Sequence, residues 1–362
     1  MGLNIKRFVN IDIKPSTLST VISTRDTVAL FVTESGTDAV YSSYSALAAT
    51  EKNDTTKAYA KIYFDNGGIK LAVYHSAGTD ATALAKKIAA LSNDIIVVAY
   101  TGEFTVLNSV AVTRKTGSAS NIDAIYGVNE KILVGRMSDV SKTVSAADNL
   151  AIKYSSIVGA EMTIAAYLCQ IDVYKADSVH DYAFTAETIA AEDIDDATYG
   201  KIITANWNVA TTLASAVRNL GGNLVANAEG YAYDIVNQYV RIILQQTVTD
   251  RVLAILTSKV KGNSGVSAIY TAIANELNKY VSNGYLATDK TYDGTTKTIS
   301  KNGVTYTLIE NGTALTTGYH LTVLPLTSLS SEDIAAHKCP DIYLYIADSY
   351  GIRTVTIQGE VI

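Results

Sequence analysis

The chain has 362 residues, of which 48% are hydrophobic and only 18% are charged, and its net charge at pH 7 is −6. That length and apolar content predict a folded protein with a large core, and we expect two domains. The acidic balance and the lack of a basic run argue against a nucleic-acid groove. The sequence contains no uncharged apolar stretch of about 18 residues, so we expect no membrane span. The N-terminus carries no apolar segment of the secretory type, so we expect synthesis in the cytoplasm.

Both ends of the chain alternate between apolar and polar residues, which is the pattern of half-buried β-strands. The apolar positions are Leu3, Ile5, Val9, Ile11 and Ile13 at one end and Val355, Ile357 and Val361 at the other. A strand at a chain end can pair with a neighbouring molecule, but the same pattern also fits ordinary edge strands of the protein's own sheet. Pro15 and Ser16 open a polar connector after the first strand and Gly351 precedes the last, so these three are hinge candidates.

The first hundred residues predict an α/β arrangement, because short apolar runs alternate with helical patterns. The expected strands are 27–32, 69–74 and 94–100, and the expected helices are 43–52, 56–64 and 81–91. Such alternation predicts a parallel sheet with helices packed on it. From 101 to about 200 the pattern is looser, with a strand near 131–135 and a helix candidate at 155–170.

The segment 187–200 is acidic and has the composition of a solvated loop. Its carboxylates are Glu187, Glu192, Asp193, Asp195 and Asp196. Carboxylates at this density can bind calcium, but the fixed ladder of an EF-hand, with its central glycine and final glutamate, is missing.

The C-terminal third has the most regular pattern. Apolar residues at helical spacing predict helices over 235–256 and 266–281, with Gly284 closing the second. Asp-Gly and Asn-Gly pairs between 292 and 313 then predict hairpin turns. Strands are expected at 320–325 and 342–347, with a short helix at 331–336 between them.

No motif for catalysis or cofactor binding is present in the sequence. Neither GxxxxGK[ST], GxGxxG nor HExxH occurs, and the four histidines are far apart. Cys169 and Cys339 fit no metal spacing, and Cys169, in an apolar stretch, is expected to be a buried thiol. Ser349 lies in a relaxed GxSxG pattern, but a strand follows it where a nucleophile elbow needs a helix. We therefore predict no catalytic, cofactor-binding or metal site, and no enzyme.

Several stretches in a fixed order resemble the sheath proteins of contractile phage tails and related injection particles. Residues 58–74 form a helix pattern that ends in an aromatic pair, followed by Asn-Gly-Gly and a strand. Residues 239–253, 283–289 and 334–362 are similar to the C-terminal half of compact sheath proteins. The stretch from 101 to 200 matches least.

The resemblance implies a fold and a domain plan. It implies an α/β (α+β) fold with a parallel-type sheet and helices in the outer part, and a helix-plus-sheet C-terminal assembly domain completed by exchanged terminal strands. Residues 1–20 would be a linking strand and connector that joins the C-terminal domain. Residues 21–205 would be the outer α/β domain, and 206–362 the assembly domain, ending in a second linking strand.

The same resemblance implies a function. The chain would be a structural subunit that stacks with copies of itself in six-membered rings around an inner tail tube protein. The sheath would contract to drive that tube through a target envelope, with baseplate and tail terminator proteins as further partners and no cofactor. The product would be a phage tail or a headless, bacteriocin-like particle. Another self-assembling particle subunit (tail tube or surface array) and an α/β enzyme remain the alternatives.

Overall fold

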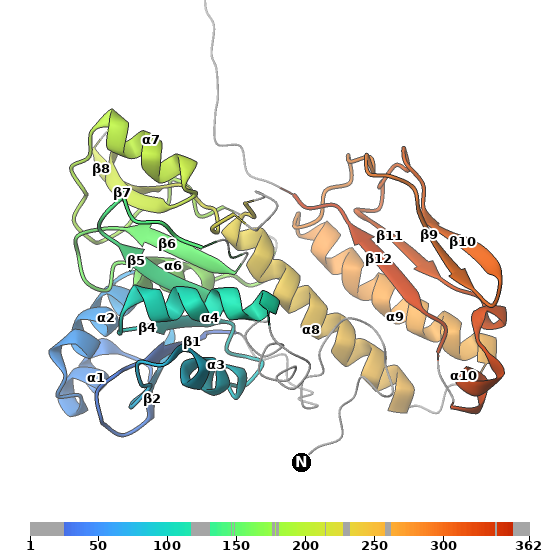
Figure 1. Cartoon of the computed structure of the whole chain (residues 1–362), viewed down its shortest axis with the longest axis horizontal. Helices are drawn as coiled ribbons and strands as arrows, with labels where there is room; N and C mark the ends of the chain where they lie inside the picture. Colours follow the sequence, from blue (N-terminus) through green and yellow to red (C-terminus); the bar gives the residue numbers. More distant parts are fainter. Residues whose placement is uncertain are drawn as a thin grey trace, which may run out of the picture. The chain divides into compact units, whose positions relative to one another are not determined.

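A computed structural model describes residues 25–116, 131–145, 147, 149–175, 178, 181–213, 215–226, 232–257, 262–336 and 339–349. These residues form two compact units (Figure 1). The sheet unit holds the described residues between 25 and 172 and between 181 and 239. The C-terminal unit holds those between 173 and 178 and between 240 and 349.

The sheet unit is built on one eight-stranded sheet with the order β2-β3-β1-β4-β5-β6-β7-β8. The strands are β1 (Thr27–Phe31), β2 (Ala39–Tyr41), β3 (Lys70–Tyr74), β4 (Val97–Tyr100), β5 (Ile132–Met137), β6 (Leu150–Tyr154), β7 (Asn208–Leu213) and β8 (Ala216–Leu220). The six central strands are parallel, and β2 and β8 close the two edges in antiparallel pairing. The parallel sheet predicted from the α/β alternation is therefore confirmed.

Helices cover both faces of this sheet. They are α1 (Tyr44–Thr50), α2 (Asp54–Asp65), α3 (Ala81–Ala89), α4 (Phe104–Thr116), α6 (Met162–Leu168) and α7 (Asp196–Thr204). Helices α3, α4 and α7 share one core cluster with β1, β4 and β5, whereas α2 packs on α6, which contacts β4 and β5. Because both faces are covered, the central strands are continuous apolar runs, and all four residues of β4 are buried.

Two expectations for the middle of the chain are wrong in detail. The helix candidate 155–170 is helical only over Met162–Leu168, because Ser155 and Ser156 bind the Glu192 carboxylate and Gly159 has a φ of 86°. The acidic segment is a loop only as far as Asp195, whose side chain accepts a hydrogen bond from the Thr198 amide and caps α7.

The C-terminal unit contains two long helices and two small antiparallel sheets (Figure 1). Its elements are α8 (Ile235–Thr257), which begins in the sheet unit, α9 (Gly262–Ser282), β9 (Lys297–Lys301), β10 (Val304–Ile309), β11 (Tyr319–Val323), the 3-10 helix η3 (Leu326–Ser328), α10 (Ser331–Ala335) and β12 (Ile342–Ile346). The Asn302-Gly303 turn between β9 and β10 has positive φ at both residues, 49° and 75°, as the hairpin prediction requires. Gly284, at φ 78°, ends α9 as expected.

The boundary between the units differs from the expected one at 205/206. Strands β7 and β8 belong to the eight-stranded sheet, and the division falls inside α8, between Tyr239 and Val240. The polar residues of β7 and β8 obscured these strands in the sequence. β8 lies at the edge of the sheet and has one buried residue of five, and β7 beside it has three of six.

Candidate assembly surface

The residues predicted to exchange between subunits lie outside the described part of the chain. They are Leu3, Ile5, Val9, Ile11, Ile13, Val355, Ile357 and Val361, and the hinge candidates Pro15, Ser16 and Gly351 lie outside it as well. They remain predictions. The structure does describe the residues beside the last predicted strand, and these form the candidate surface.

Strand β12 has one edge that no strand of the described residues covers. It pairs with β11 in antiparallel register, with Leu344 opposite Leu321. The amide of Leu324 donates to the Asp341 carbonyl (3.0 Å) and that of Ala347 to the Gly318 carbonyl (2.9 Å). Because such bonds alternate along an antiparallel pair, the backbone groups of residues 342, 344 and 346 point away from β11. This edge can therefore accept a further strand.

The β11–β12 sheet has one apolar face. Its side chains are Tyr319, Leu321, Val323, Ile342, Leu344 and Ile346, all of them half-buried. Helix α9 contacts β11, and the Tyr319 hydroxyl donates to Asn278 Oδ1 on α9 (3.0 Å). The helix thus buries only part of a face that has the composition of a core.

The chain beyond β12 is held in place by Asp348. Its carboxylate accepts two hydrogen bonds from the Arg241 guanidinium on α8, one of them 3.2 Å from Nε. Asp348 also forms a β-bridge with Leu286, and the Ser349 amide donates to the Tyr285 carbonyl (3.3 Å). A bidentate arginine–carboxylate pair fixes direction as well as position, so α8 orients the described residues that follow β12, 347–349.

A buried carboxylate organises the polar side of α9. Glu276 accepts hydrogen bonds from the Tyr174 hydroxyl (2.8 Å), Lys279 Nζ (2.8 Å) and Arg251 Nε (3.1 Å). Burial raises the pKa of Glu276, but these three donors outweigh it, so its pKa lies below the ordinary value. Glu276 occupies a position in the apolar stripe of α9, and an acid at such a position is the sequence signal that could have identified this network.

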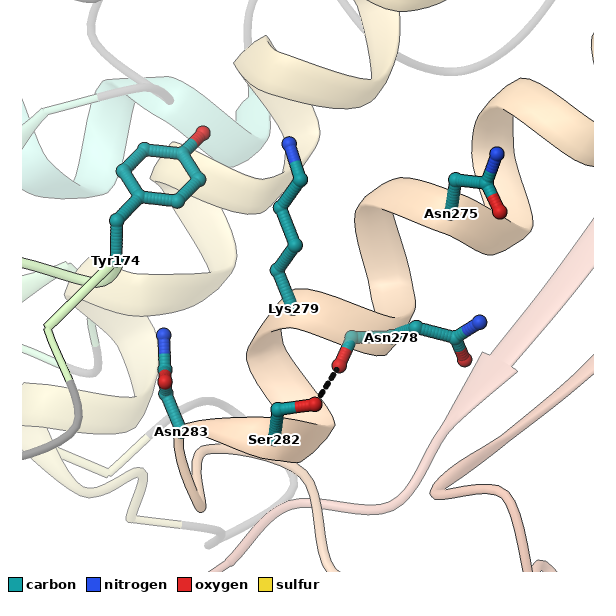
Figure 2. Close-up of a pocket in the computed structure, with 6 residues that line it drawn as sticks. All are labelled: Tyr174, Asn275, Asn278, Lys279, Ser282 and Asn283. Atoms are coloured by element: carbon teal, nitrogen blue, oxygen red, sulfur yellow. Dashed lines mark hydrogen bonds between the residues drawn. The ribbon is translucent and has the colours of Figure 1, made fainter.

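An open pocket of about 340 Å³ lies beside this network (Figure 2). It is lined by Tyr174, Asn275, Asn278, Lys279, Ser282 and Asn283. Lys279 Nζ lies 5.4 Å from the centre of the Tyr174 ring, and Asn283 Nδ2 donates to the Val173 carbonyl (2.8 Å). Its lining is polar on the α9 side, where Ser282 Oγ donates to the Asn278 carbonyl (2.8 Å) and Lys279 Nζ to Glu276 Oε2 (2.8 Å).

In α/β enzymes the ligand site lies at the carboxyl ends of the strands, where the strand order switches direction. Here that place lies between β1 and β4. The Tyr100 hydroxyl donates to the Gly78 carbonyl (2.7 Å), and the Thr33 amide donates to Thr101 Oγ1 (3.3 Å). These bonds tie the loops that follow β1, β3 and β4 to one another.

Two carboxylates of the acidic segment form hydrogen bonds inside the sheet unit, contrary to the expectation of a solvated loop. Glu187 is buried, and both of its carboxylate oxygens lie 2.7 Å from Lys153 Nζ. Glu192 accepts hydrogen bonds from Ser155 and Ser156. The described residues include no group of three or more metal-ligating side chains.

The remaining candidates for chemistry are divided between the two units or lie outside the described residues. His75 is paired with Glu51 (3.0 Å) in the sheet unit, and His320 lies on β11, while His180 and His337 fall outside the described residues. Cys169 is buried, as predicted, and accepts a hydrogen bond from the Tyr63 hydroxyl (3.2 Å). Among the described helices, none is both long enough and apolar enough to cross a membrane.

Comparison with known proteins supports the resemblance seen in the sequence. Residues 235–361 match the family model described as E217 tail sheath protein gp31-like, C-terminal domain. This match covers α8 and the rest of the C-terminal unit that follows it, but less than half of the chain. A search of curated protein sequences gave no match.

The fold is similar to those of solved sheath proteins. A chain of the PVC sheath complex, an extracellular contractile injection system in the contracted state, superposes with a TM-score of 0.64 at 16% identity, covering 97% of this chain and 95% of that one. A chain of the contracted helical sheath of the anti-feeding prophage gives 0.61 at 14% identity, covering 95% and 98%. A sheath tail protein from Listeria innocua gives 0.52 at 9% identity, covering 89% and 94%. The resemblance to contractile tail sheath proteins and the predicted α/β fold with a mostly parallel sheet are confirmed, while the exchange of terminal strands stays a prediction.

Proposed function

We propose that this chain is the structural subunit of a contractile tail sheath. It polymerises around an inner tube, stays linked to its neighbours by exchanged terminal strands, and contracts to drive the tube through a target cell envelope. The observation that carries this proposal is the uncovered edge of β12, beside a half-buried apolar face, in the part of the chain that matches a sheath domain model.

The energetics of a shared strand fit this role. A strand of about ten residues added to the edge of β12 forms several backbone hydrogen bonds, each contributing about 0.5–1.5 kcal/mol net. Burial of its apolar residues adds about 25 cal/mol per Å². A linkage of this size persists while weaker surface contacts between subunits break and re-form. The energy for contraction then resides in the assembly, and no nucleotide is required.

The partners follow from the same proposal. They are copies of this chain in a helical sheath of six-membered rings, the inner tube protein, and the baseplate and terminator proteins at the two ends. The particle is made in the cytoplasm of the bacterial host and forms a phage tail or a released tail-like particle. A non-enzymatic role is supported by the match to a sheath domain model and by the likeness to solved sheath proteins.

Negative-stain electron microscopy of the full chain at high concentration tests the proposal. We expect hollow, striated tubes of uniform width. The double variant Val355→Asp, Ile357→Asp should form none, because it places charges on the apolar side of the C-terminal strand. Thr356→Asp, on the opposite side of the same predicted strand, is the matched control and should still form tubes.

Subunit stability must be followed in parallel. The single tryptophan, Trp207, is 3% exposed in the sheet unit, so its fluorescence reports whether that unit is folded. We expect the same unfolding midpoint in all three chains. Tubes formed by the double variant, or a wild-type chain that forms no tubes at any concentration, would contradict the proposal.

A further inference from the structure

Strand β8 ends the eight-stranded sheet on the side of β7 (Figure 1), and the chain itself covers its outer edge. Residues 182–187 run along this edge, and we call them the strap. The Asn219 amide on β8 donates to the Thr185 carbonyl (2.9 Å). The Glu187 amide donates to the Val217 carbonyl (3.2 Å). The strap therefore occupies backbone groups that an added strand would need.

The strap is buried at its two ends but exposed in the middle. Tyr182 is 1% exposed, and the side chain of Glu187 is 2% exposed. Between them, Phe184 is 39% exposed and has a φ of 62°. Positive φ is unfavourable for a bulky side chain. Contacts at the ends must offset this strain, because the middle of the strap buries little surface of its own.

A buried ammonium group holds the end of the strap at Glu187. Lys153 Nζ on β6 lies 2.7 Å from each oxygen of the Glu187 carboxylate. The same nitrogen donates to Asn219 Oδ1 on β8 (3.0 Å). The Tyr182 hydroxyl also donates to Glu187 and lies 3.0 Å from Thr163 Oγ1. Lys153 thus joins the strap to two strands of the sheet.

We propose that the strap prevents the β8 edge from pairing with a second copy of this chain, and that the Lys153–Glu187 pair keeps the strap closed. An uncovered edge pairs with any strand of matching hydrogen-bond pattern, and the same edge of a second copy matches by two-fold symmetry. With the axis at residue 218, the backbone groups of 217 in one copy face those of 219 in the other. The inference lies within the sheet unit and does not depend on assembly through β12.

Disulfide cross-linking of the full chain tests the proposal. Arg218→Cys places a thiol at the proposed axis, where the Cα atoms of a non-hydrogen-bonded pair lie about 4.5 Å apart, within reach of a disulfide. The native cysteines are replaced by Cys169→Ala and Cys339→Ser. We expect the cross-linked dimer to form about tenfold faster when Glu187→Gln is added. The neutral amide keeps the size of the carboxylate but loses the charged bond to Lys153.

Asp54→Cys is the matched control for random collisions. Its native side chain is 97% exposed on α2, so its cross-linking rate should be the same with and without Glu187→Gln. Arg218→Cys also removes the bond from Arg218 Nη1 to the Phe184 carbonyl (2.9 Å), but both compared chains lack it. Trp207 fluorescence checks that each chain is folded.

A milder variant covers the case in which Glu187→Gln unfolds the sheet unit. Tyr182→Phe removes the hydroxyl that donates to Glu187 and leaves the ion pair in place. Its rate of cross-linking through Arg218→Cys should lie between those of the parent and Glu187→Gln. A rate equal to the parent's in both variants would overturn the proposal.

A disulfide across the strap gives a second measurement. Ala186 and Arg218 form an antiparallel bridge, so Ala186→Cys with Arg218→Cys can form a disulfide within one chain. Combined with Glu187→Gln, this chain should dimerise when the disulfide is reduced and be monomeric when it is oxidised. Sedimentation velocity below the concentration at which tubes form measures this. The same dimer fraction in both states would contradict the proposal.

Discussion

Strands β4 and β12 have similarly apolar sequences but are buried to different extents in their two units. The residues of β4 are Val-Val-Ala-Tyr and all are buried, whereas those of β12 are Ile-Tyr-Leu-Tyr-Ile and all are only half-buried. Two strands of similarly apolar sequence are thus buried to different extents. Hydropathy sets how much a strand gains by burial, but the number of layers around it decides how much burial it obtains within one subunit.

The edges of the two sheets differ in the same way. In the sheet unit the outer edge of β8 is covered by residues 184–187, since the amide of Phe184 donates to the Asn219 carbonyl (2.7 Å) and that of Glu187 to the Val217 carbonyl (3.2 Å). The edge of β12 has no such cover among the described residues until Ala347. The chain itself thus covers the β8 edge, whereas the β12 edge is the one at which we propose that another strand is added.

The largest expected effect tests whether the sheet unit is self-sufficient. Glu187→Ala removes the only acidic partner recorded for Lys153 among the described residues and leaves a fully buried ammonium group. Loss of one member of a buried ion pair costs about 3–5 kcal/mol. We expect that loss in the free energy of unfolding of the sheet unit, measured by Trp207 fluorescence in urea.

Asp54→Ala is the control for this ion pair. Asp54 and Lys57 are paired at 3.4 Å on the surface of α2, where the Asp54 side chain is 97% exposed. An exposed pair contributes about 0–1 kcal/mol, so this variant should unfold almost as the parent does. If Glu187→Ala lost no more stability than Asp54→Ala, the buried pair would not stabilise the unit.

A second prediction uses the buried Glu161, which precedes α6 and lies near Tyr59 and Arg136. Burial raises the pKa of Glu161 to about 7, although Tyr59 and Arg136 oppose this. The folded protein therefore holds a proton that the unfolded chain releases near its ordinary pKa of 4.5. Protonated Glu161 therefore adds to the free energy of unfolding. This addition is fully present below pH 4.5 and is lost as the pH rises through about 7, a change of about 3 kcal/mol.

The comparison of wild type with Glu161→Gln isolates this contribution. Other carboxyl groups, such as those of Asp139 and Asp195, have lowered pKa values and shift stability in the opposite direction at acid pH. The difference in unfolding free energy between the two chains removes their effect. We expect that difference to change steadily between pH 4.5 and 7. A difference independent of pH would show that Glu161 titrates normally in the folded unit.

Local signals made much of the fold predictable. The Asn302-Gly303 pair predicted its hairpin because few residues adopt positive φ at two successive positions. Continuous apolar runs predicted β1, β3 and β4, since strands covered on both faces need no polar side. These features depend on neighbours in sequence, and the sequence shows them directly.

Features that depend on distant partners were missed. Lys153 and Glu187 are 34 positions apart, and nothing local indicates that the two charges are buried together. Strand β7 carries polar residues and joins the sheet through Asn208, whose side chain donates to the Ile152 carbonyl (3.0 Å). Tyr174 and Glu276 are separated by 102 positions. The contacts that join β7 to the sheet and that form the Glu276 network are therefore long-range ones.

The smallest expected effect compares one leucine from each unit. Leu133 on β5 is fully buried, and Leu133→Ala should cost about 2–5 kcal/mol in the isolated subunit. Leu344 on β12 is half-buried, so Leu344→Ala should cost only about 1 kcal/mol there. Trp207 fluorescence reports the first loss, and amide exchange of β11 and β12 reports the second.

The difference in stability loss between Leu133→Ala and Leu344→Ala should decrease on assembly. A strand added at the edge of β12 would bury Leu344 against a neighbouring chain. Protection of β12 amides in assembled tubes should then fall further in Leu344→Ala than it does in the free subunit. Leu133 is fully buried within one subunit, so Leu133→Ala should lose the same stability in the free subunit and in tubes. If Leu344→Ala also lost the same amount in both states, the edge of β12 would play no part in assembly.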